Sequence, residues 1–507
     1  MFKDPSLLKQ QAYVNGKWVA GAEACCFTVE NPADGAELGF VPDMSARDAA
    51  TAIDAANVAL PGWRALSAAA RADNLYRWYE LMLANADDLA LLVTLEQGKP
   101  LTEAMVEVRY AAAYLRWYAE EARRVYGDII PAAQPGQRTL VLRQPIGVVA
   151  AITPWNFPLA MITRKCSPAL AAGCTMVLKP AEATPLSALA LAELADRAGI
   201  PAGVFNVVTA ARGDVVGREL TSNPLVRKLS FTGSTATGKL LAEQCAATVK
   251  RVSLELGGQA PFLVFADADM DAAIAGALQA KGRNSGQACI AANRFLVQQS
   301  VYASFVAKLT ATYQALTVGA GTTANVQQGP LINLQALQKV ERHVADAVAK
   351  GAELCCGGKR AAVPELSGCF YSPTVLANVT PAMLVAQEET FGPVAAVTPF
   401  ATEAEALALA NNTSVGLAAY VYSRDLGSSA PAQRSTASSF HSRMRPIATW
   451  EPRQRSRSRR RRCARSRRRR RRTRRDIERR RSRSSSWRRS MSDNDRLSPM
   501  SRRCWCI

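Results

Sequence analysis

The stretch that predicts the fold covers residues 148–179 and reads VVAAITPWNFPLAMITRKCSPALAAGCTMVLK. The apolar run 148–153 predicts a buried strand, residues 158–172 predict a helix, and residues 175–178 predict a second strand. When strands and helices alternate in this way, the strands form a parallel sheet and the helices cover both of its faces. We therefore expect an α/β fold, with ligands at the carboxyl ends of these strands.

The alternation extends on both sides of this stretch. Residues 45–121 have apolar positions at helical spacing and open with a capping-box pattern of Ser45 and Asp48, and residues 126–144 predict a hairpin around Gln134-Pro135-Gly136. Further strands are predicted at 204–208, 228–231, 261–265, 294–297, 395–400 and 417–422. Further helices are predicted to begin at Thr184-Pro185, with Thr184 as the N-cap, and to cover 234–244, 269–281, 301–316 and 403–410.

The net charge of +21 comes from one end of the chain. Residues 431–507 contain 28 Arg, no Lys and 5 acidic residues, whereas residues 1–430 contain 35 basic and 37 acidic residues. The first 430 residues therefore have the charge balance of an ordinary globular protein. Any affinity for polyanions belongs to the C-terminal segment alone.

The cysteines and histidines exclude several classes of protein. Cys25-Cys26 and Cys355-Cys356 are adjacent pairs, which do not usually bridge each other, so we expect no disulfide framework and a reducing compartment. No Cys pair has the spacing of a zinc site, so we expect no metal. Residues 1–430 hold a single His, His343, which nearly excludes a Cys–His hydrolase and leaves acid–base work to Glu.

The start of the chain predicts a cytoplasmic location. Residues 1–5 read MFKDP and are followed by no apolar signal region and no Arg-rich amphipathic stretch. No apolar run along the chain is long enough to cross a bilayer, so we expect no contact with membranes.

Three residues far apart in the chain could supply a nucleophile, a base and an oxyanion donor. Cys289 lies in the run GQACIAANR, Glu255 precedes it by 34 residues, and Asn156 follows Trp155. A thiolate can attack a carbonyl, a carboxylate can activate water, and an amide can hold the developing oxyanion. Each has an ordinary alternative, as a small core residue, a strand-end charge or a turn residue. Their combination favours catalysis.

Two further features favour a nucleotide. The run from Gly233 to Gly238, GSTATG, follows a strand and opens a helix, so its backbone N–H groups could bind a phosphate; a plain tight turn is an equal alternative. Lys179 follows a strand and has Glu182 three residues later, a pair that could bind the two hydroxyls of a ribose. A surface ion pair is the alternative for these two residues.

On these motifs, residues 10–425 resemble the NAD(P)-dependent aldehyde dehydrogenase superfamily. The resemblance implies Cys289 as the nucleophile, Glu255 as the general base, and Asn156 with the Cys289 N–H as the oxyanion hole; it adds Lys165 to the catalytic residues. It implies a cofactor site formed by Thr153, Trp155, Lys179, Glu182, Gly213, Gly233, Ser234, Leu256, Gly257, Glu389 and Phe391. The run Glu389-Thr390-Phe391-Gly392-Pro393 matches the segment that holds the nicotinamide ribose.

The resemblance also implies the organisation of the chain. It predicts a Rossmann-like cofactor domain over residues 1–253, an oligomerisation hairpin at about 126–144, and an α/β catalytic domain over 254–425. The family's homo-oligomers, dimers or tetramers, are expected only if the C-terminal segment permits them.

Within the superfamily the sequence is most similar to succinate-semialdehyde dehydrogenases. The likeness lies in residues 161–165, MITRK, and 282–287, GRNSGQ. It implies that Arg164 and Arg283 bind the distal carboxylate of the substrate, which suits a bidentate guanidinium. Structural ion pairs are the alternative for both. We therefore expect oxidation of a short semialdehyde, succinate semialdehyde first and glutarate semialdehyde or another aldehyde as alternatives, in γ-aminobutyrate degradation.

The sequence departs from the family pattern at three places. Ala291 stands where some relatives have a second Cys, so no regulatory disulfide is expected there. Glu182 replaces a small residue of NADP-using relatives, and its carboxylate would repel a 2′-phosphate; we expect NAD to be preferred, with NADP as the alternative. The family's final segment is replaced by residues 426–507.

We expect the sequence after about Leu426 to be a frame-shifted translation and to be disordered. The match ends after Asp425, within a domain, and G+C-rich DNA read in a wrong frame gives Arg but seldom Lys. Such a chain, lacking part of its catalytic domain, is expected to be unstable or inactive as written. A different class of function is also open: an inactive scaffold whose Arg-rich tail binds RNA without sequence preference.

Overall fold

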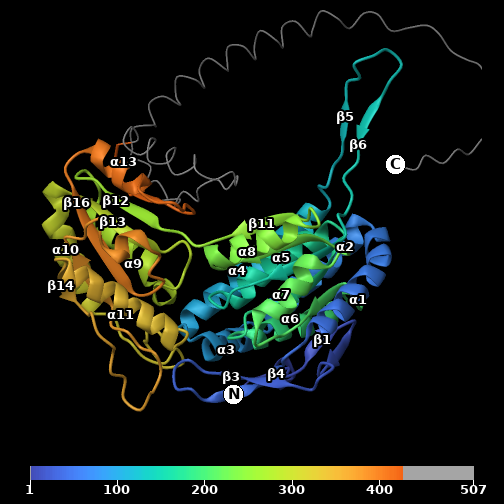
Figure 1. Ribbon diagram of the computed structural model, residues 1–507, viewed down its shortest axis with the longest axis horizontal. Coiled ribbons are helices and arrows are strands. Elements are labelled where there is room, and N and C mark those ends of the chain that lie inside the picture. Colours follow the sequence, from blue (N-terminus) through green and yellow to red (C-terminus); the bar gives the residue numbers. More distant parts are fainter. Residues whose placement is uncertain (1, 426–507) are drawn as a thin grey trace, which may run out of the picture. The chain divides into compact units, whose positions relative to one another are not determined.

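The computed structural model describes residues 2–425, and the segment 426–507, predicted to be a disordered Arg-rich tail, lies outside the described residues. Two mixed sheets and their helices account for most of residues 2–425 (Figure 1). The α/β class predicted from the sequence is confirmed.

The first sheet has seven strands and contains the βαβ unit predicted at residues 148–179. Its strands are β1 (Ala12–Val14), β2 (Lys17–Val19), β7 (Val148–Ile152), β8 (Thr175–Lys179), β9 (Phe205–Val207), β10 (Val226–Thr232) and β11 (Arg251–Glu255). They are arranged in the order β11-β10-β7-β8-β9-β1-β2. Strands β7 to β11 are parallel, and β1 adds an antiparallel edge to β9.

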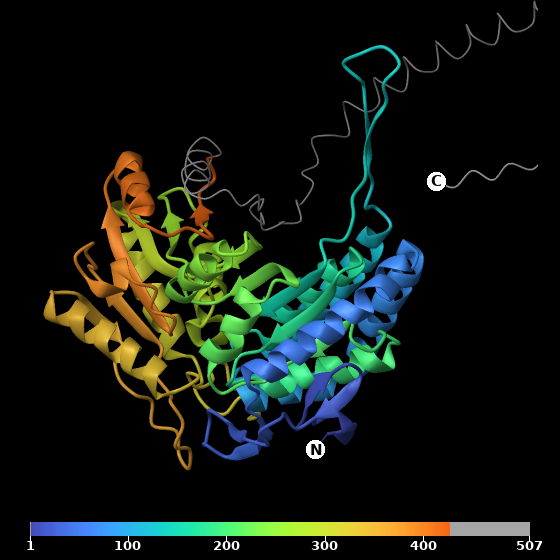
Figure 2. The ribbon, with the colours of Figure 1, turned by 45° about the vertical axis from the view of Figure 1, so that its right-hand side comes forward.

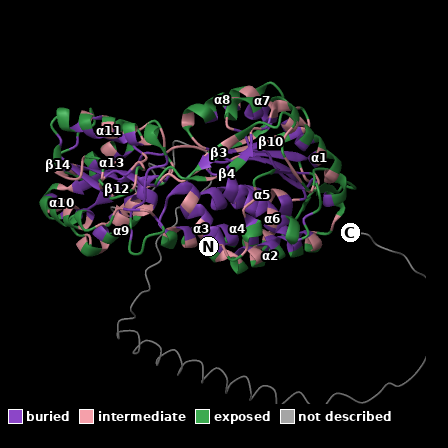
Figure 3. Cartoon of the chain, turned by 90° about the horizontal axis from the view of Figure 1, so that it is seen from below, coloured by how far each residue is buried: buried purple, intermediate pink, exposed green. Residues whose placement is uncertain are grey.

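Helices cover both faces of this sheet, as the sequence predicts. Their bounds are α1 (Ala46–Ala65), α2 (Ala68–Ala84), α3 (Ala86–Gln97), α4 (Leu101–Ala122), α5 (Pro158–Ala171), α6 (Pro185–Arg197), α7 (Gly213–Ser222) and α8 (Thr235–Ala246). Val149 and Ala151 of β7 pack with α2 to α6, whereas Val148 and Ala150 pack with α1, α7 and α8. This alternation follows from the two-residue period of a strand, and the central strands β7, β8 and β9 are buried on both faces, within a largely buried sheet (Figure 3).

The second sheet is a smaller version of the same design. Its strands are β12 (Ala260–Val264), β13 (Ala292–Gln298), β14 (Glu353–Cys356), β15 (Thr374–Ala377), β16 (Val394–Phe400) and β17 (Tyr420–Tyr422), in the order β14-β15-β16-β13-β12-β17. Its helices are α9 (Met270–Gly282) and α10 (Gln299–Gln314) on one face, and α11 (Leu334–Ala349), α12 (Leu384–Gln387) and α13 (Glu403–Asn411) on the other. All its strands are parallel except β14.

Two hairpins complete the described chain, together with two short 3-10 helices. The hairpins are β3 (Cys26–Glu30) with β4 (Glu37–Pro42), and β5 (Asp128–Ile130) with β6 (Thr139–Val141); the 3-10 helices are η1 (Pro5–Leu7) and η2 (Arg283–Gly286). The β5–β6 hairpin matches the one predicted at 126–144 and projects away from the first sheet (Figure 2). Every residue of its two strands is exposed, including Ile129 and Leu140.

Most predicted elements are present within two or three residues of their expected limits. Ser45 and Asp48 form the capping box at the start of α1. The elements without a sequence prediction are β1 to β4, β11, β14, β15, α7, α11, α12 and the 3-10 helices η1 and η2. The predicted boundary between residues 253 and 254 falls inside β11, the last strand of the first sheet along the chain, and remains a prediction. Among the described residues, no helix combines the length and the apolar character needed to cross a membrane.

Thr184 is the N-cap residue of α6, as predicted, with Pro185 at the first helical position, but it does not cap the helix through its side chain. Its side chain makes no capping hydrogen bond, and its buried hydroxyl has no hydrogen-bond partner among residues 2–425. The first amides of α6 are instead bound by Glu96, which comes from α3: its carboxylate accepts from Leu186 N and, at 2.9 Å, from Ser187 N. A carboxylate at a helix N-terminus satisfies unpaired N–H groups and is favoured by the helix dipole.

A pair of substitutions distinguishes these two capping arrangements. We expect Glu96→Ala to lower the free energy of unfolding by at least about 2 kcal/mol, because two buried amides lose their acceptors. Thr184→Val keeps the shape and removes only an unpaired hydroxyl, so it should be neutral or slightly stabilising. Denaturant titration of both variants measures the difference; a larger loss in Thr184→Val than in Glu96→Ala would restore Thr184 as the cap.

Candidate active site

Strand register brings several of the predicted site residues to one edge of the first sheet. Ile152, the last residue of β7, pairs with Lys179 on one side and Phe231 on the other, and Thr232 pairs with Glu255. Residues that directly follow these strand ends therefore lie near one another. They include Thr153, Gly233 and Leu256 from the predicted cofactor set, and Gly233 N donates a 3.1 Å hydrogen bond to the Glu255 carbonyl oxygen.

The loop before Cys289 has an unusual backbone. Asn284, Ser285 and Gly286 have φ values of 52°, 55° and 76°, a left-handed run that non-glycine residues rarely adopt. A Cβ on Gly286 would overlap the Gly392 carbonyl oxygen, which explains the glycine. Buried hydrogen bonds hold the loop: Ser285 Oγ donates to Gly329 O at 2.9 Å, and Gln287 Oε1 accepts from Ile332 N at 3.0 Å.

Asn156 contacts this loop directly. Its Nδ2 donates to the Gln287 carbonyl oxygen at 3.0 Å, two residues before Cys289. Its own carbonyl oxygen accepts from Asn284 Nδ2 at 2.9 Å and from Lys99 Nζ at 2.7 Å. The side chain of Asn156 is buried, and one of its two amide hydrogens is used by Gln287. The structure therefore brings the predicted oxyanion donor to the segment that carries the predicted nucleophile.

The thiol of Cys289 lies in a partly buried, negatively charged setting. Burial raises its pKa to about 11, and the carboxylates of Glu389 and Glu255 act in the same direction, whereas Arg164 opposes them. The thiol is therefore protonated at neutral pH, and a nucleophilic thiolate requires a base to accept its proton.

Glu255 lies beside two cationic side chains of α5. Its Oε1 is 3.5 Å from Nη2 of Arg164, and both side chains are about one-quarter exposed (28% and 23%). Lys165 is buried, donates to Ser230 Oγ at 3.2 Å and has its pKa lowered to about 7 by burial, although Glu255 acts in the opposite direction. The predicted base, one predicted substrate anchor and the predicted catalytic lysine thus occupy one region.

The predicted cofactor residues form two groups. In the first, buried Lys179 lies 3.4 Å from the exposed carboxylate of Glu182, and a Cβ on Gly213 would be 3.7 Å from the Lys179 amine. Ser234 caps α8 by accepting from Thr237 N at 3.2 Å, next to Gly233. A helix N-terminus beside a lysine suits a phosphate-bearing nucleotide.

The second group surrounds Glu389. Its Oε1 accepts from Gly258 N at 3.2 Å, and a Cβ on Gly257 would lie 2.6 Å from its Oε2. Burial raises the pKa of Glu389 to about 7, while Lys339 and Lys281 favour its charged form. Phe391 has a left-handed φ of 56° and packs edge-on against Trp155, with ring centroids 5.6 Å apart.

Arg283, the second predicted anchor, stacks over the ring of Phe157 with its Cζ 4.8 Å from the ring centroid. Sequence reasoning missed the residues that support the site from α4 and the turn before it: Lys99, Glu103 and Glu107. Glu103 and Glu107 are four residues apart, a spacing that places them on one helix face, but in the sequence they look like an ordinary solvated pair.

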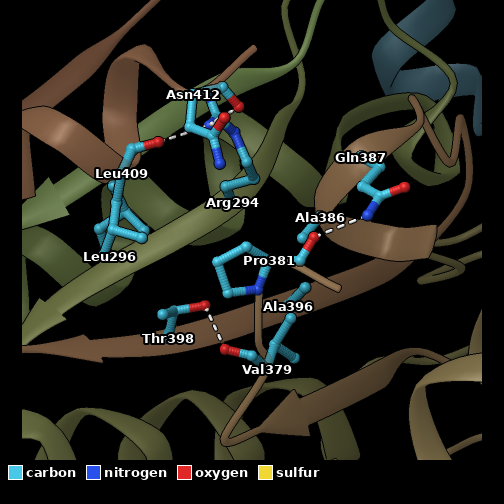
Figure 4. A pocket seen from close by; sticks show the side chains of 10 residues that line it. All are labelled: Arg294, Leu296, Val379, Pro381, Ala386, Gln387, Ala396, Thr398, Leu409 and Asn412. Carbon is cyan, nitrogen blue, oxygen red and sulfur yellow. Dashed lines mark hydrogen bonds between the residues drawn. The ribbon is translucent and has the colours of Figure 1, made fainter. Parts of the chain in front are cut away.

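A separate cavity of about 260 Å³ lies on the second sheet, between β13, β16, α12 and α13 (Figure 4). It contains none of the predicted site residues. Arg294 lines the cavity and donates to the carbonyl oxygens of Leu409 at 2.8 Å and Asn412 at 3.4 Å. Its guanidinium therefore binds carbonyl oxygens at the C-terminal end of α13. Among the described residues, no group of three or more His, Cys, Asp or Glu side chains could hold a metal ion.

Comparisons with known proteins agree with this arrangement. A family model described as the aldehyde dehydrogenase family matches residues 18–439. The chain belongs to the aldehyde dehydrogenase family. It is 58% identical over 424 residues to a glutarate-semialdehyde dehydrogenase of Pseudomonas aeruginosa, which covers 84% of this chain and 87% of that protein.

Two further relatives support the assignment. The chain is 58% identical over 423 residues to the Escherichia coli succinate-semialdehyde dehydrogenase [NADP(+)] GabD, covering 83% of this chain and 87% of that protein. The crystal structure of a succinate-semialdehyde dehydrogenase from Burkholderia pseudomallei superposes with a TM-score of 0.84 at 55% identity, covering 86% of this chain and 89% of that chain. Aldehyde dehydrogenases act on aldehydes and use NAD or NADP, so this chain is placed among the NAD(P)-dependent oxidoreductases.

The charges around Cys289 predict how its reactivity depends on pH. Because only the thiolate is alkylated, the rate of Cys289 alkylation by iodoacetamide should rise about tenfold per pH unit up to a midpoint near pH 11. Glu389→Gln removes a carboxylate that raises this pKa, so it should increase the rate at pH 9. The neighbouring Glu388→Gln, whose carboxylate binds His343, is the control. Mass spectrometry of the Cys289 peptide gives the rate; a midpoint below pH 8 would contradict this account.

Proposed function

We propose that this aldehyde dehydrogenase oxidises a short semialdehyde with a distal carboxylate to the dicarboxylate, with succinate semialdehyde as its substrate and glutarate semialdehyde as the alternative. The observation that carries the proposal is the setting of Cys289. Its loop is bound by Asn156, its thiol pKa responds to Glu255, and Arg164 lies 3.5 Å from Glu255. The names of relatives from Pseudomonas aeruginosa and Escherichia coli support a semialdehyde.

The residues divide the reaction into two parts. The Cys289 thiol releases its proton to water, and the sulfur then attacks the aldehyde carbon to give a thiohemiacetal. Asn156 Nδ2 and the Cys289 N–H donate to the resulting oxyanion. The nicotinamide, when bound, supplies the acceptor for the substrate's hydride. In the second part, Glu255 takes a proton from water, which hydrolyses the Cys289 thioester and releases the acid.

Several features fit a bound dinucleotide. A Cβ on Gly213 would lie 3.7 Å from the Lys179 amine, and one on Gly257 would lie 2.6 Å from Glu389 Oε2, so both glycines keep side-chain atoms away from these charged groups. Thr232, at the end of β10, has a buried hydroxyl without a hydrogen-bond partner in the described chain. We assign the Lys179–Glu182 pair to the adenosine ribose and Glu389 to the nicotinamide ribose, with Trp155 and Phe391 beside the nicotinamide.

Removing the nucleophile or the base should affect different steps. Cys289→Ala should abolish aldehyde oxidation, whereas Glu255→Gln should still give a burst of NADH and then slow turnover about 100-fold or more, because thioester hydrolysis loses its base. The measurement is rapid-mixing NADH fluorescence on the full chain. Normal steady-state oxidation by Cys289→Ala would exclude the mechanism.

The charge of Glu182 should set the choice of cofactor. We propose that NAD is preferred, because the exposed carboxylate would lie beside the ribose 2′-OH and would repel a 2′-phosphate. Glu182→Gln keeps the size and should improve kcat/KM for NADP relative to NAD by about tenfold, whereas Glu182→Asp keeps the charge and should retain the preference. A higher kcat/KM with NADP than with NAD in the unchanged protein would overturn this proposal. The comparison is informative because the name of the Escherichia coli relative includes NADP(+).

Arg283 is the cleaner probe of substrate charge, because Arg164 also pairs with Glu255. Arg283→Ala should raise KM for succinate semialdehyde about 10- to 100-fold, the loss of one charged hydrogen bond, and should leave KM for an uncharged aldehyde of similar length nearly unchanged. Arg251→Ala, an exposed arginine of β11, is the control. An equal rise in KM for both aldehydes would show that Arg283 has a structural role and does not bind the substrate carboxylate.

The other expectations concern assembly and location. Members of the family are commonly oligomeric, and we propose that the exposed apolar residues of the β5–β6 hairpin, Ile129, Leu140 and Leu142, bind a second copy of the chain. We propose a cytoplasmic location. The alternative of an inactive scaffold with an RNA-binding tail has no support from the relatives, and its Arg-rich segment lies outside the described residues.

A further inference from the structure

We propose that Lys99 and Glu107, a fully buried ion pair, are positioning residues that hold Asn156 in place to bind the oxyanion. This inference rests on the proposed function, in which Asn156 is the side-chain donor to the thiohemiacetal oxygen. Neither residue touches Cys289 in the structure. They act on Asn156 through its backbone, from the start of α4 and the turn before it.

The Lys99 amine makes three contacts around Asn156. The amine pairs with Glu107 Oε2, donates to the Asn156 carbonyl oxygen at 2.7 Å, and lies 3.9 Å from the centroid of the Phe157 ring. The side chains of Lys99 and Glu107 have no exposed surface. Lys99 therefore fixes the peptide that follows Asn156 and the side chain of the next residue, Phe157.

Glu107 fixes the chain on the other side of Phe157. Its second carboxylate oxygen accepts from Leu159 N at 2.9 Å and from Ala160 N at 3.3 Å, the first free amides of α5. Phe157, the residue at the N-cap position of α5, provides no side-chain cap. The single carboxylate thus caps α5 and anchors the lysine that holds Asn156.

A second carboxylate of α4 connects the same helix to the Cys289 loop. Glu103, one turn before Glu107, accepts from Asn284 N at 2.7 Å. Asn284 Nδ2 in turn donates to the Asn156 carbonyl oxygen, the atom that Lys99 binds, at 2.9 Å. Helix α4 therefore fixes both loops of the site, the one that bears Asn156 and the one that leads to Cys289.

The chemistry of the pair favours positioning over stability. Burying an ion pair gives little or no net stabilisation compared with apolar side chains of the same volume. A charged pair does, however, hold a carbonyl and two amides in fixed directions, and an oxyanion donor must be placed to within a fraction of an ångström. The alternative is that the pair only caps α5 and has no effect on the position of Asn156.

The test uses the double variant Lys99→Met/Glu107→Gln on the full chain. It removes both charges together, so no unpaired charge stays buried, and the glutamine oxygen can still accept from the α5 amides. We expect the NADH burst rate to fall about 10- to 100-fold, since misplacement of a catalytic group by about 1 Å has that effect. KM for the cofactor and the alkylation rate of Cys289 should stay within about twofold of the unchanged protein, because neither requires the oxyanion donor. The control Lys9→Met/Glu193→Gln removes a 3.0 Å ion pair between Lys9, which precedes β1, and Glu193 of α6, and it should leave the burst unchanged.

The same double variant in an Asn156→Ala background decides the route of the effect. If Lys99 and Glu107 act through Asn156, they should add no further loss to the burst rate of Asn156→Ala. The proposal would be overturned in favour of a capping role if the double variant reduced the burst rate of Asn156→Ala by as large a factor as it reduces the burst rate of the protein that retains Asn156. A fall in the alkylation rate that matches the fall in the burst rate would overturn it in the same way. A normal burst in Asn156→Ala alone would show instead that the proposed function has the wrong oxyanion donor.

Discussion

The site depends on the hydrogen bond from Asn156 Nδ2 to the carbonyl oxygen of Gln287. Asn156 follows a strand of the first sheet, and Gln287 lies in the loop that leads into β13 of the second sheet, so this bond links residues whose elements fold around separate cores. The left-handed run at 284–286 brings Gln287 to this position, and its strain is offset by buried hydrogen bonds of Ser285 and Gln287.

The charged side chains around Cys289 differ from those around Glu255. Burial and, after it, the carboxylates of Glu389 and Glu255 raise the pKa of the Cys289 thiol, while Arg164 and Lys165 lie beside Glu255. Glu389 has a raised pKa and two lysines within electrostatic reach, so a ligand that binds it would change the charge felt by Cys289. Cofactor binding and thiol activation are therefore expected to be coupled.

The sequence was sufficient for the central parallel strands, because buried parallel strands are continuous apolar runs such as 148–152 and 260–264. It failed for short or half-exposed strands such as β11, β14 and β15, and for the cap of α6, since Glu96 is distant in sequence from the amides it binds. The predicted residues that follow adjacent strands do lie together. Lys99, Glu103 and Glu107 could not be found, because burial of charged residues is visible only when the helices are packed.

The most direct test of the account is to trap the acyl group on Cys289. Glu255→Gln is mixed with succinate semialdehyde and NAD, quenched in acid after the NADH burst, and its peptides are analysed by mass spectrometry. The account predicts a succinyl thioester on Cys289 alone, in an amount equal to the NADH formed, removable by hydroxylamine and absent without NAD. NADH formed while Cys289 stays unmodified, or an acyl group on a different cysteine, would contradict it.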